Sequence, residues 1–178
     1  MNRAKDLSAN IIDVIKEEQI KLGYMKEQIR LYYPLSSLNL MMEESLDCEA
    51  MKKHLEKYFA KRQEIFGEVE VSYKDERFCI HLSDDASEYV YKNTPHEGFL
   101  YDFIELVSKH DVTIDEILAL FKKYSENVIF EEMKDSEFDY LIYFKDGTPD
   151  IYWYCINDEG HHFTYHRYTK EDFYNLGL

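Results

Sequence analysis

The sequence predicts an α+β protein built from two units, at residues 1–94 and 95–178. In both units, apolar residues first recur at helical spacing and then alternate with polar ones, which indicates helices followed by antiparallel strands. Six glycines and three prolines are few for this length, and most fall between those segments. The polar run Asn93-Thr94-Pro95 marks the boundary. Because this linker is too short for a flexible tether, we expect the two units to pack together.

The first unit has the order helix, short strand, two helices and β-hairpin. Its expected elements are a helix at 6–22, a strand at 29–33, helices at 34–42 and 48–66, hairpin arms at 69–73 and 78–82, and a short helix at 83–91. Gly23 is placed to end the first helix, and Asp47 to cap the start of the third. Pro34 suits the first position of the second helix, and Lys74-Asp75-Glu76 forms the hairpin turn.

This order of elements resembles the winged-helix form of the helix-turn-helix. In that architecture the third helix is the usual recognition helix and the hairpin is the wing. The resemblance implies a winged-helix-like unit at residues 1–94, and it rests on element order and hydrophobic pattern rather than on a residue signature. A fold of this kind assigns no function by itself.

The second unit is predicted to be a helical hairpin followed by a four-stranded antiparallel meander. The expected helices run from 99 to about 110 and from 113 to about 124, the strands cover 128–130, 138–144, 151–156 and 162–168, and a short helix follows residue 169. Thr113 and Glu116 form a capping box for the second helix, and Thr169 and Asp172 cap the last one. Turns rich in Asp, Asn and Gly separate the last three strands.

The charge, the apolar segments and the cysteines of the sequence lead to expectations about partners and location. The chain carries 21 basic and 36 acidic side chains, a net charge of −15, so bulk nucleic acid and anionic membranes repel it unless a local basic patch overrides that field. Residues 1–94 hold 14 basic and 18 acidic side chains (net −4), and residues 95–178 hold 7 and 18 (net −11). No segment approaches the roughly 20 apolar residues of a membrane span. The start lacks the apolar core of a secretory signal, and three cysteines are an odd number, so we expect a cytoplasmic protein with reduced thiols.

A basic helix face is the first candidate site. The residues that would contact DNA phosphates or a protein partner are Lys52, Lys53, Lys57, Lys61 and Arg62 of the third helix and Lys74 and Arg77 of the wing. Glutamates are interleaved on the same helix, as on any solvated helix surface, and the helix has few of the side chains that read base edges. The pattern therefore leaves two readings open, a DNA contact and a solvated or partner-facing surface.

A histidine–cysteine cluster is the second candidate. It consists of Cys155, His161, His162 and His166, all of which are residue types that bind zinc. Strand alternation places His162 and His166 on one face, and Cys155 on the preceding strand would oppose His161 or His162 across the turn. The spacing matches no known metal motif, and Cys155 is also expected as a small buried apolar residue. No other cofactor is indicated.

The aromatic strands of the second unit are the third candidate. They carry Tyr140, Tyr143, Phe144, Tyr152, Trp153, Tyr154, Phe163, Tyr165 and Tyr168. Such strands bury one face in a core and leave the other as a binding surface, or they bury both faces in a two-sided core or a dimer interface. Single-stranded nucleic acid needs a basic groove, so a protein partner or a neutral or cationic ligand fits this acidic half better.

Three functional hypotheses follow from these candidates. The first is a non-enzymatic interaction module that binds a protein partner or a second copy, because nucleophile elbows, P-loops, dinucleotide fingerprints, HExxH and CxxC are all absent. The second is a DNA-binding transcriptional regulator that uses the third helix. The third is a metal-binding protein or enzyme centred on Cys155, His162 and His166.

The whole chain also resembles an uncharacterised bacterial family known only as a domain of unknown function. The resemblance covers nearly the full length. It rests on three runs, Ile29-Arg30-Leu31-Tyr32-Tyr33-Pro34-Leu35-Ser36-Ser37-Leu38, Glu137-Phe138-Asp139-Tyr140 and Tyr165-His166-Arg167-Tyr168-Thr169-Lys170-Glu171-Asp172. It implies no activity and carries over no site residues.

Overall fold

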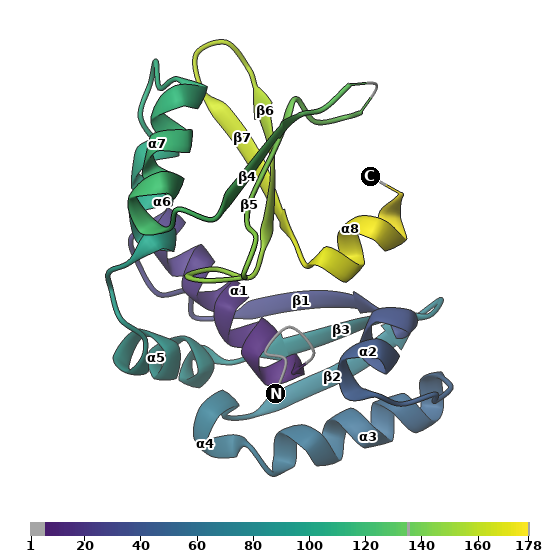
Figure 1. Cartoon of the computed structure of the whole chain (residues 1–178). Coiled ribbons are helices and arrows are strands. Elements are labelled where there is room, and N and C mark those ends of the chain that lie inside the picture. The colour runs from purple at the N-terminus through teal and green to yellow at the C-terminus, as the bar shows by residue number, and fades with distance from the viewer. Residues whose placement is uncertain (1–5, 135, 178) are drawn as a thin grey trace. The chain divides into compact units, whose positions relative to one another are not determined.

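A computed structural model describes residues 6–134 and 136–177, and the chain divides into two compact units after Thr94 (Figure 1). Helices and two separate antiparallel sheets confirm the α+β class. The first unit contains α1 Leu7–Leu22, β1 Ile29–Pro34, α2 Leu35–Met42, α3 Cys48–Ala60, α4 Gln63–Phe66, β2 Val69–Lys74, β3 Arg77–Leu82 and α5 Asp84–Asn93. The second contains α6 Phe99–Val107, α7 Ile114–Tyr124, β4 Val128–Glu132, β5 Tyr140–Phe144, β6 Trp153–Asp158, β7 Phe163–Tyr168 and α8 Lys170–Leu176.

The first sheet has the strand order β1-β3-β2, with β3 antiparallel to both neighbours. The side chains of its strands alternate between a buried and a more exposed face. In β3, for example, Phe78, Ile80 and Leu82 are fully buried. One apolar core joins this face of the sheet to the helices of the unit. Its helical members are Leu7, Ile11, Ile15, Leu38, Met51, Leu55, Phe59, Phe66, Ala86 and Val90. The helices of the first unit therefore pack on a single face of the sheet.

Local signals place the ends of these elements as the sequence predicts. Gly23 adopts a left-handed conformation (φ 72°) after α1, and the Asp47 carboxylate accepts a hydrogen bond from the Ala50 backbone at the start of α3. The hairpin turn is tighter than predicted, because Lys74 belongs to β2 and only Asp75 and Glu76 connect the strands. Both turn residues have positive φ, as the twist of a two-residue hairpin requires.

The prediction of one third helix at 48–66 is wrong, because the helix breaks at Lys61 and Arg62 and resumes as the short α4. Arg62 leaves helical geometry and lays its guanidinium 3.7 Å from the centre of the Tyr58 ring, while Nη1 donates to the Tyr58 carbonyl. This bond satisfies a carbonyl that the end of the helix leaves without an intrahelical partner. No glycine or proline signals the break, so the apolar spacing alone extends the helix too far. Pro34 was predicted at the first position of the second helix, but it ends β1 and directly precedes α2.

The second sheet is the predicted meander, with the order β4-β5-β6-β7 and antiparallel pairing throughout. The capping box of Thr113 and Glu116 opens α7, and Thr169 caps α8 by accepting a hydrogen bond from the Asp172 backbone. Several boundaries shift: α6 ends at Val107, β4 extends to Glu132, β5 begins at Tyr140, β6 runs from Trp153 to Asp158, and β7 begins at Phe163. None of these shifts changes which face a strand residue occupies.

The two faces of this second sheet have different coverings. One face packs under the hairpin of α6 and α7, where the centroids of the Phe99, Phe103 and Phe121 rings lie 4.7–5.7 Å from those of Phe144 or Tyr154. The other face carries a smaller apolar cluster of Phe138, Leu141, Trp153, Cys155 and Phe173, of which only Phe173 comes from a helix, α8. The helical hairpin thus covers one face, and α8 covers part of the other.

Candidate interaction surfaces

Of the basic residues of α3, Lys53 and Lys57 are exposed and Lys52 is half-buried, and Lys52 and Lys53 are each paired with a carboxylate. Lys53 Nζ lies 3.2 Å from a Glu49 oxygen, and Lys52 Nζ lies 3.8 Å from a Glu56 oxygen, both at i,i+4 spacing on one helix. Lys57 is exposed in the last turn, Lys61 follows the end of α3, and the guanidinium of Arg62 stacks on Tyr58. The two hairpin residues of this candidate site, Lys74 and Arg77, are register partners next to the turn between β2 and β3. The surface of α3 therefore alternates between positive and negative side chains. Exposed ion pairs of this kind contribute under about 1 kcal/mol each to the stability of a protein.

The structure brings together only part of the predicted histidine–cysteine cluster. Cys155 and His166 are opposite each other in β6 and β7, whereas His161 and His162 belong to the connecting turn. The expectation that Cys155 opposes His161 or His162 is wrong, because β6 extends to Asp158 and the register places both histidines beyond the paired residues. His161 Nδ1 lies 3.6 Å from an Asp111 oxygen in the second unit. Within residues 6–134 and 136–177, no three His, Cys, Asp or Glu side chains are grouped to hold a metal ion.

Cys155 is a buried structural thiol. Its side chain is inaccessible to solvent, and burial, followed by the negative charge of Glu137, raises the pKa of the thiol to about 12. The neutral thiol therefore persists at physiological pH, and it is the thiolate that binds metals and attacks electrophiles. The expectation of a small buried apolar residue is confirmed.

The second face of the C-terminal sheet carries a row of aromatic side chains across its middle strands. The Tyr143 and Trp153 rings stack at 4.0 Å between centroids with an angle of 11° between their planes. Trp153 also contacts two rings of α8, Phe173 at 5.1 Å and Tyr174 at 5.7 Å. In the adjoining strand, Tyr168 is the register partner of Trp153. We call this set, Tyr143, Trp153, Tyr168, Phe173 and Tyr174, the aromatic face.

The aromatic face is only partly covered and has an acidic surround. Trp153 and Phe173 are buried, but Tyr143 and Tyr168 are half-buried and Tyr174 is 62% exposed. Burial raises the pKa of the Tyr143 phenol, and so does the nearby carboxylate of Glu131. Burial likewise raises the pKa of Tyr168, with a further contribution from Glu137. These effects place two carboxylates close enough to the rings to act on them electrostatically.

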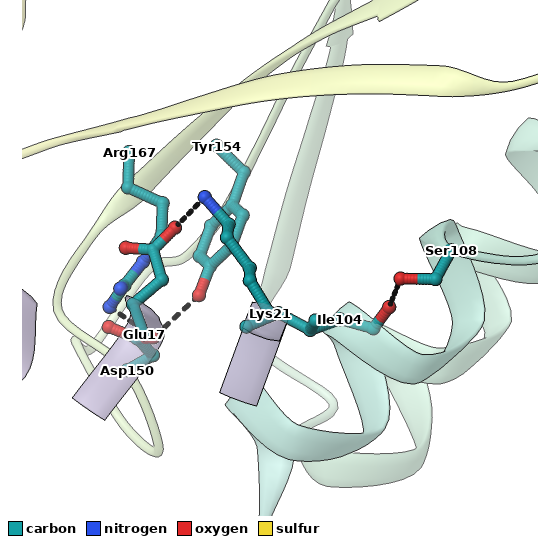
Figure 2. A network of polar contacts seen from close by, with 7 residues as sticks. All are labelled: Glu17, Lys21, Ile104, Ser108, Asp150, Tyr154 and Arg167. Carbon is teal, nitrogen blue, oxygen red and sulfur yellow. Dashed lines mark hydrogen bonds and ion pairs between the residues drawn. The ribbon is translucent and has the colours of Figure 1, made fainter. Parts of the chain in front are cut away.

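A buried polar cluster that the sequence analysis did not identify lies on the face of the second sheet that α6 and α7 cover (Figure 2). The Asp150 carboxylate accepts hydrogen bonds from the Tyr154 hydroxyl at 2.6 Å and the Tyr152 backbone at 3.0 Å, and it lies 3.3 Å from Arg167 Nη2. The Arg167 guanidinium also lies 4.3 Å from the Tyr152 ring centre, and its side chain is 4% exposed. Strand alternation offered a signal, because it puts Arg167 on the same face as the buried Phe163, where a charge needs an opposite charge.

The Asp150 cluster ties the segment between β5 and β6 to β7. Its carboxylate is engaged by the Tyr154 hydroxyl, the Tyr152 backbone and the Arg167 guanidinium. We therefore read it as a structural cluster. None of the helices in the described residues combines the length and apolarity that crossing a bilayer requires.

Comparison with known proteins gives a family but no activity. The model of the family described as a domain of unknown function, E. rectale gene description (DUF3877), matches residues 4–177. The chain belongs to the DUF3877 family. The resemblance read from the three sequence runs is thereby confirmed over nearly the full length. No curated protein and no solved structure matches this DUF3877 member significantly.

Proposed function

We propose that this protein is a non-enzymatic interaction module that binds a protein partner through the aromatic face. The observation that carries the proposal is the stacked Tyr143–Trp153 pair beside the exposed ring of Tyr174. Tyrosine and tryptophan bury a large area at little conformational cost, and both are enriched where partners bind. Leu176, at the end of the same helix, is 61% exposed and adds apolar area that the second unit leaves open.

The charge around the aromatic face favours a basic partner. Residues 95–178 carry a net charge of −11, and Glu131 and Glu137 act on the rings of the face. A second copy of this chain would bring the same negative charge to the interface, so self-association through this face is disfavoured. A protein segment that combines lysine or arginine with apolar side chains would complement both the negative charge and the aromatic rings of this face.

A capture experiment with matched variants tests this proposal. The tagged full-length chain is used to capture partners from its native cells, and Trp153, the only tryptophan of the sequence, reports titration with a Lys/Leu amphipathic peptide. We expect the double substitution Tyr174→Ala and Glu131→Lys to abolish capture of the partner and to weaken binding of the peptide at least tenfold. Glu64→Lys, on the exposed surface of α4, is the control and should change neither result. Equal binding by both variants, or a compact monomer that captures nothing, contradicts the proposal.

Duplex DNA binding through α3 is a second candidate. It is supported by the order of elements in the first unit, by the strand order β1-β3-β2, and by the exposed side chains of Lys53, Lys57 and Lys61. A salt titration of duplex binding by the full chain tests it, since phosphate contacts weaken steeply with salt. The double substitution Lys53→Glu and Lys57→Glu should abolish that binding, and an unchanged affinity would exclude α3 as the contact.

We further propose that the protein works in the cytoplasm. Its three cysteines, Cys48, Cys79 and Cys155, are all free thiols, which supports a reducing compartment. Fractionation of native cells, followed by detection of the chain, tests this location. Recovery from the extracellular fraction would contradict it.

A further inference from the structure

The face of the first sheet that points away from the helices of its own unit has a distinctive composition. The face consists of Arg30, Tyr32 and Pro34 from β1, Arg77, Cys79 and His81 from β3, and Glu70, Ser72 and Lys74 from β2, and we call it the open sheet face. None of these nine residues belongs to the apolar core that joins the sheet to the helices. Tyr32, in the middle of the first strand, is 53% exposed. The face thus offers a tyrosine ring on a flat support.

The register arranges the open sheet face in three rows. The first row is Glu70, His81 and Arg30, the second is Ser72, Cys79 and Tyr32, and the third is Lys74, Arg77 and Pro34. Because a strand rises about 3.3 Å per residue, successive rows on one face are about 6.6 Å apart. The exposed ring of Tyr32 therefore has a cation in the row on either side, and the Arg77 guanidinium lies 5.5 Å from its centre.

The cations of this face are available to a ligand. Within the described part of the chain, no carboxylate forms an ion pair with Arg30, Lys74 or Arg77, in contrast to the paired lysines of α3. The one acidic residue of the face, Glu70, lies 3.4 Å from His81 Nδ1. The turn residues Asp75 and Glu76 lie beyond the third row. Three unpaired cations against one carboxylate make a local positive patch on a chain of net charge −15.

We propose that the open sheet face binds single-stranded nucleic acid, with a base stacked on Tyr32 and the flanking phosphates held by Arg30, Arg77 and Lys74. A positive surface that tracks the backbone and an aromatic ring that stacks on bases are the two features that such sites share. A duplex hides the faces of its bases, and a polyglutamate peptide has no ring to stack on Tyr32, so we expect both to bind this surface more weakly. The negative charge elsewhere is screened beyond about 8–10 Å at physiological salt, which leaves the local patch effective.

Fluorescence anisotropy of the full-length chain with labelled 12-nucleotide single strands of DNA and RNA tests the proposal. Three phosphate contacts on a single strand predict a salt slope near −2, hence roughly 20-fold weaker binding at 200 mM than at 50 mM salt. We expect Tyr32→Ala to weaken binding roughly 5- to 100-fold, Tyr32→Phe to retain it, and Arg30→Gln with Arg77→Gln to weaken it and flatten the salt slope. The controls are Tyr24→Ala, whose ring is 59% exposed outside this face, and Lys57→Gln on α3; both should bind as the unmodified chain does.

Cysteine alkylation gives a second readout that needs no variant. Cys79 lies beside Tyr32 in the middle row, and Cys48 begins α3, and both are half-buried. Bound oligonucleotide should slow iodoacetamide modification of Cys79 and leave that of Cys48 unchanged. The proposal is overturned if the single strand does not bind at 50 mM salt, if Tyr32→Ala binds normally, if Cys79 stays unprotected, or if a duplex or a polyglutamate peptide binds as tightly.

Discussion

The buried pair of Asp150 and Arg167 gives the sharpest test of what holds the second unit together. The substitution Asp150→Asn keeps the shape of the side chain and removes the charge that lies 3.3 Å from the guanidinium of Arg167, whose side chain is 4% exposed. Removing one member of a buried ion pair costs about 3–5 kcal/mol. We expect about 3 kcal/mol, because the Tyr152 and Tyr154 rings continue to face the guanidinium at 4.3 and 5.6 Å.

The single tryptophan makes this effect measurable in the full chain. Trp153 lies in β6, next to Tyr154, so its fluorescence reports unfolding of the second unit. For a domain of 60–100 residues, 1 kcal/mol shifts Tm by roughly 4–8 °C, so we expect Asp150→Asn to lower the fluorescence midpoint by roughly 12–24 °C. Asp146→Asn is the matched control, since that carboxylate is exposed in the preceding turn and its loss should cost under about 0.5 kcal/mol.

A double-mutant cycle separates the hydrogen bond from the ion pair. Tyr154→Phe removes the 2.6 Å bond to Asp150 and should cost about 2 kcal/mol, as expected for a hydrogen bond to a charged group. Because both substitutions act on one cluster, the combined loss should be smaller than the sum of the two. If Asp150→Asn shifts the Trp153 midpoint no more than Asp146→Asn does, the buried pair does not stabilise the unit and the reasoning fails.

Three further outcomes are expected. The hydrogen bond from Lys123 holds the pKa of Asp102 below its usual value. The stability from this pair is therefore present above about pH 4 and is lost as the pH falls through the lowered pKa. Asp102→Asn should make the Tm, measured by Trp153 fluorescence, less dependent on pH in this acidic range. Cys155, with a pKa of about 12, should resist iodoacetamide at pH 8 until the chain is unfolded in urea, whereas the two half-buried cysteines react first by mass spectrometry. Phe121→Ala removes a fully buried ring and should cost about 3–5 kcal/mol in urea unfolding; a loss under 1 kcal/mol would contradict its place in the core.

Periodicity and capping residues predicted most of this fold because those signals are local. The four strands of the meander and the capping box of Thr113 and Glu116 were read directly from alternation and from residue spacing. The break after α3 was not predictable in this way. It depends on the guanidinium of Arg62 reaching back to the Tyr58 ring and carbonyl, and an arginine at that position is equally compatible with an unbroken helix.

The candidate sites show the same division between local and non-local information. The burial of Cys155 as a small apolar residue was predicted from its residue type, and the structure confirms it. The partner of Cys155 depends instead on where β6 ends, which is a property of two strands and their turn. The pairing of Asp150 with Arg167 joins residues 17 positions apart through a loop, so the sequence offered only the indirect signal of a charge on a buried face.

The two sheets share a feature that bears on function. In each unit the main apolar core lies on one face, where the helices pack, and the other face keeps exposed aromatic rings, Tyr32 in the first unit and Tyr174 in the second. Packing explains why aromatic residues occupy the core positions. Aromatic rings that are exposed to solvent contribute little to the stability of the fold. Substitutions at Tyr32 or Tyr174 should therefore change binding while leaving Tm within a few degrees, and substitutions such as Phe121→Ala should do the reverse. A loss of stability at both exposed rings would mean that they serve packing, and the two proposed surfaces would lose their main support.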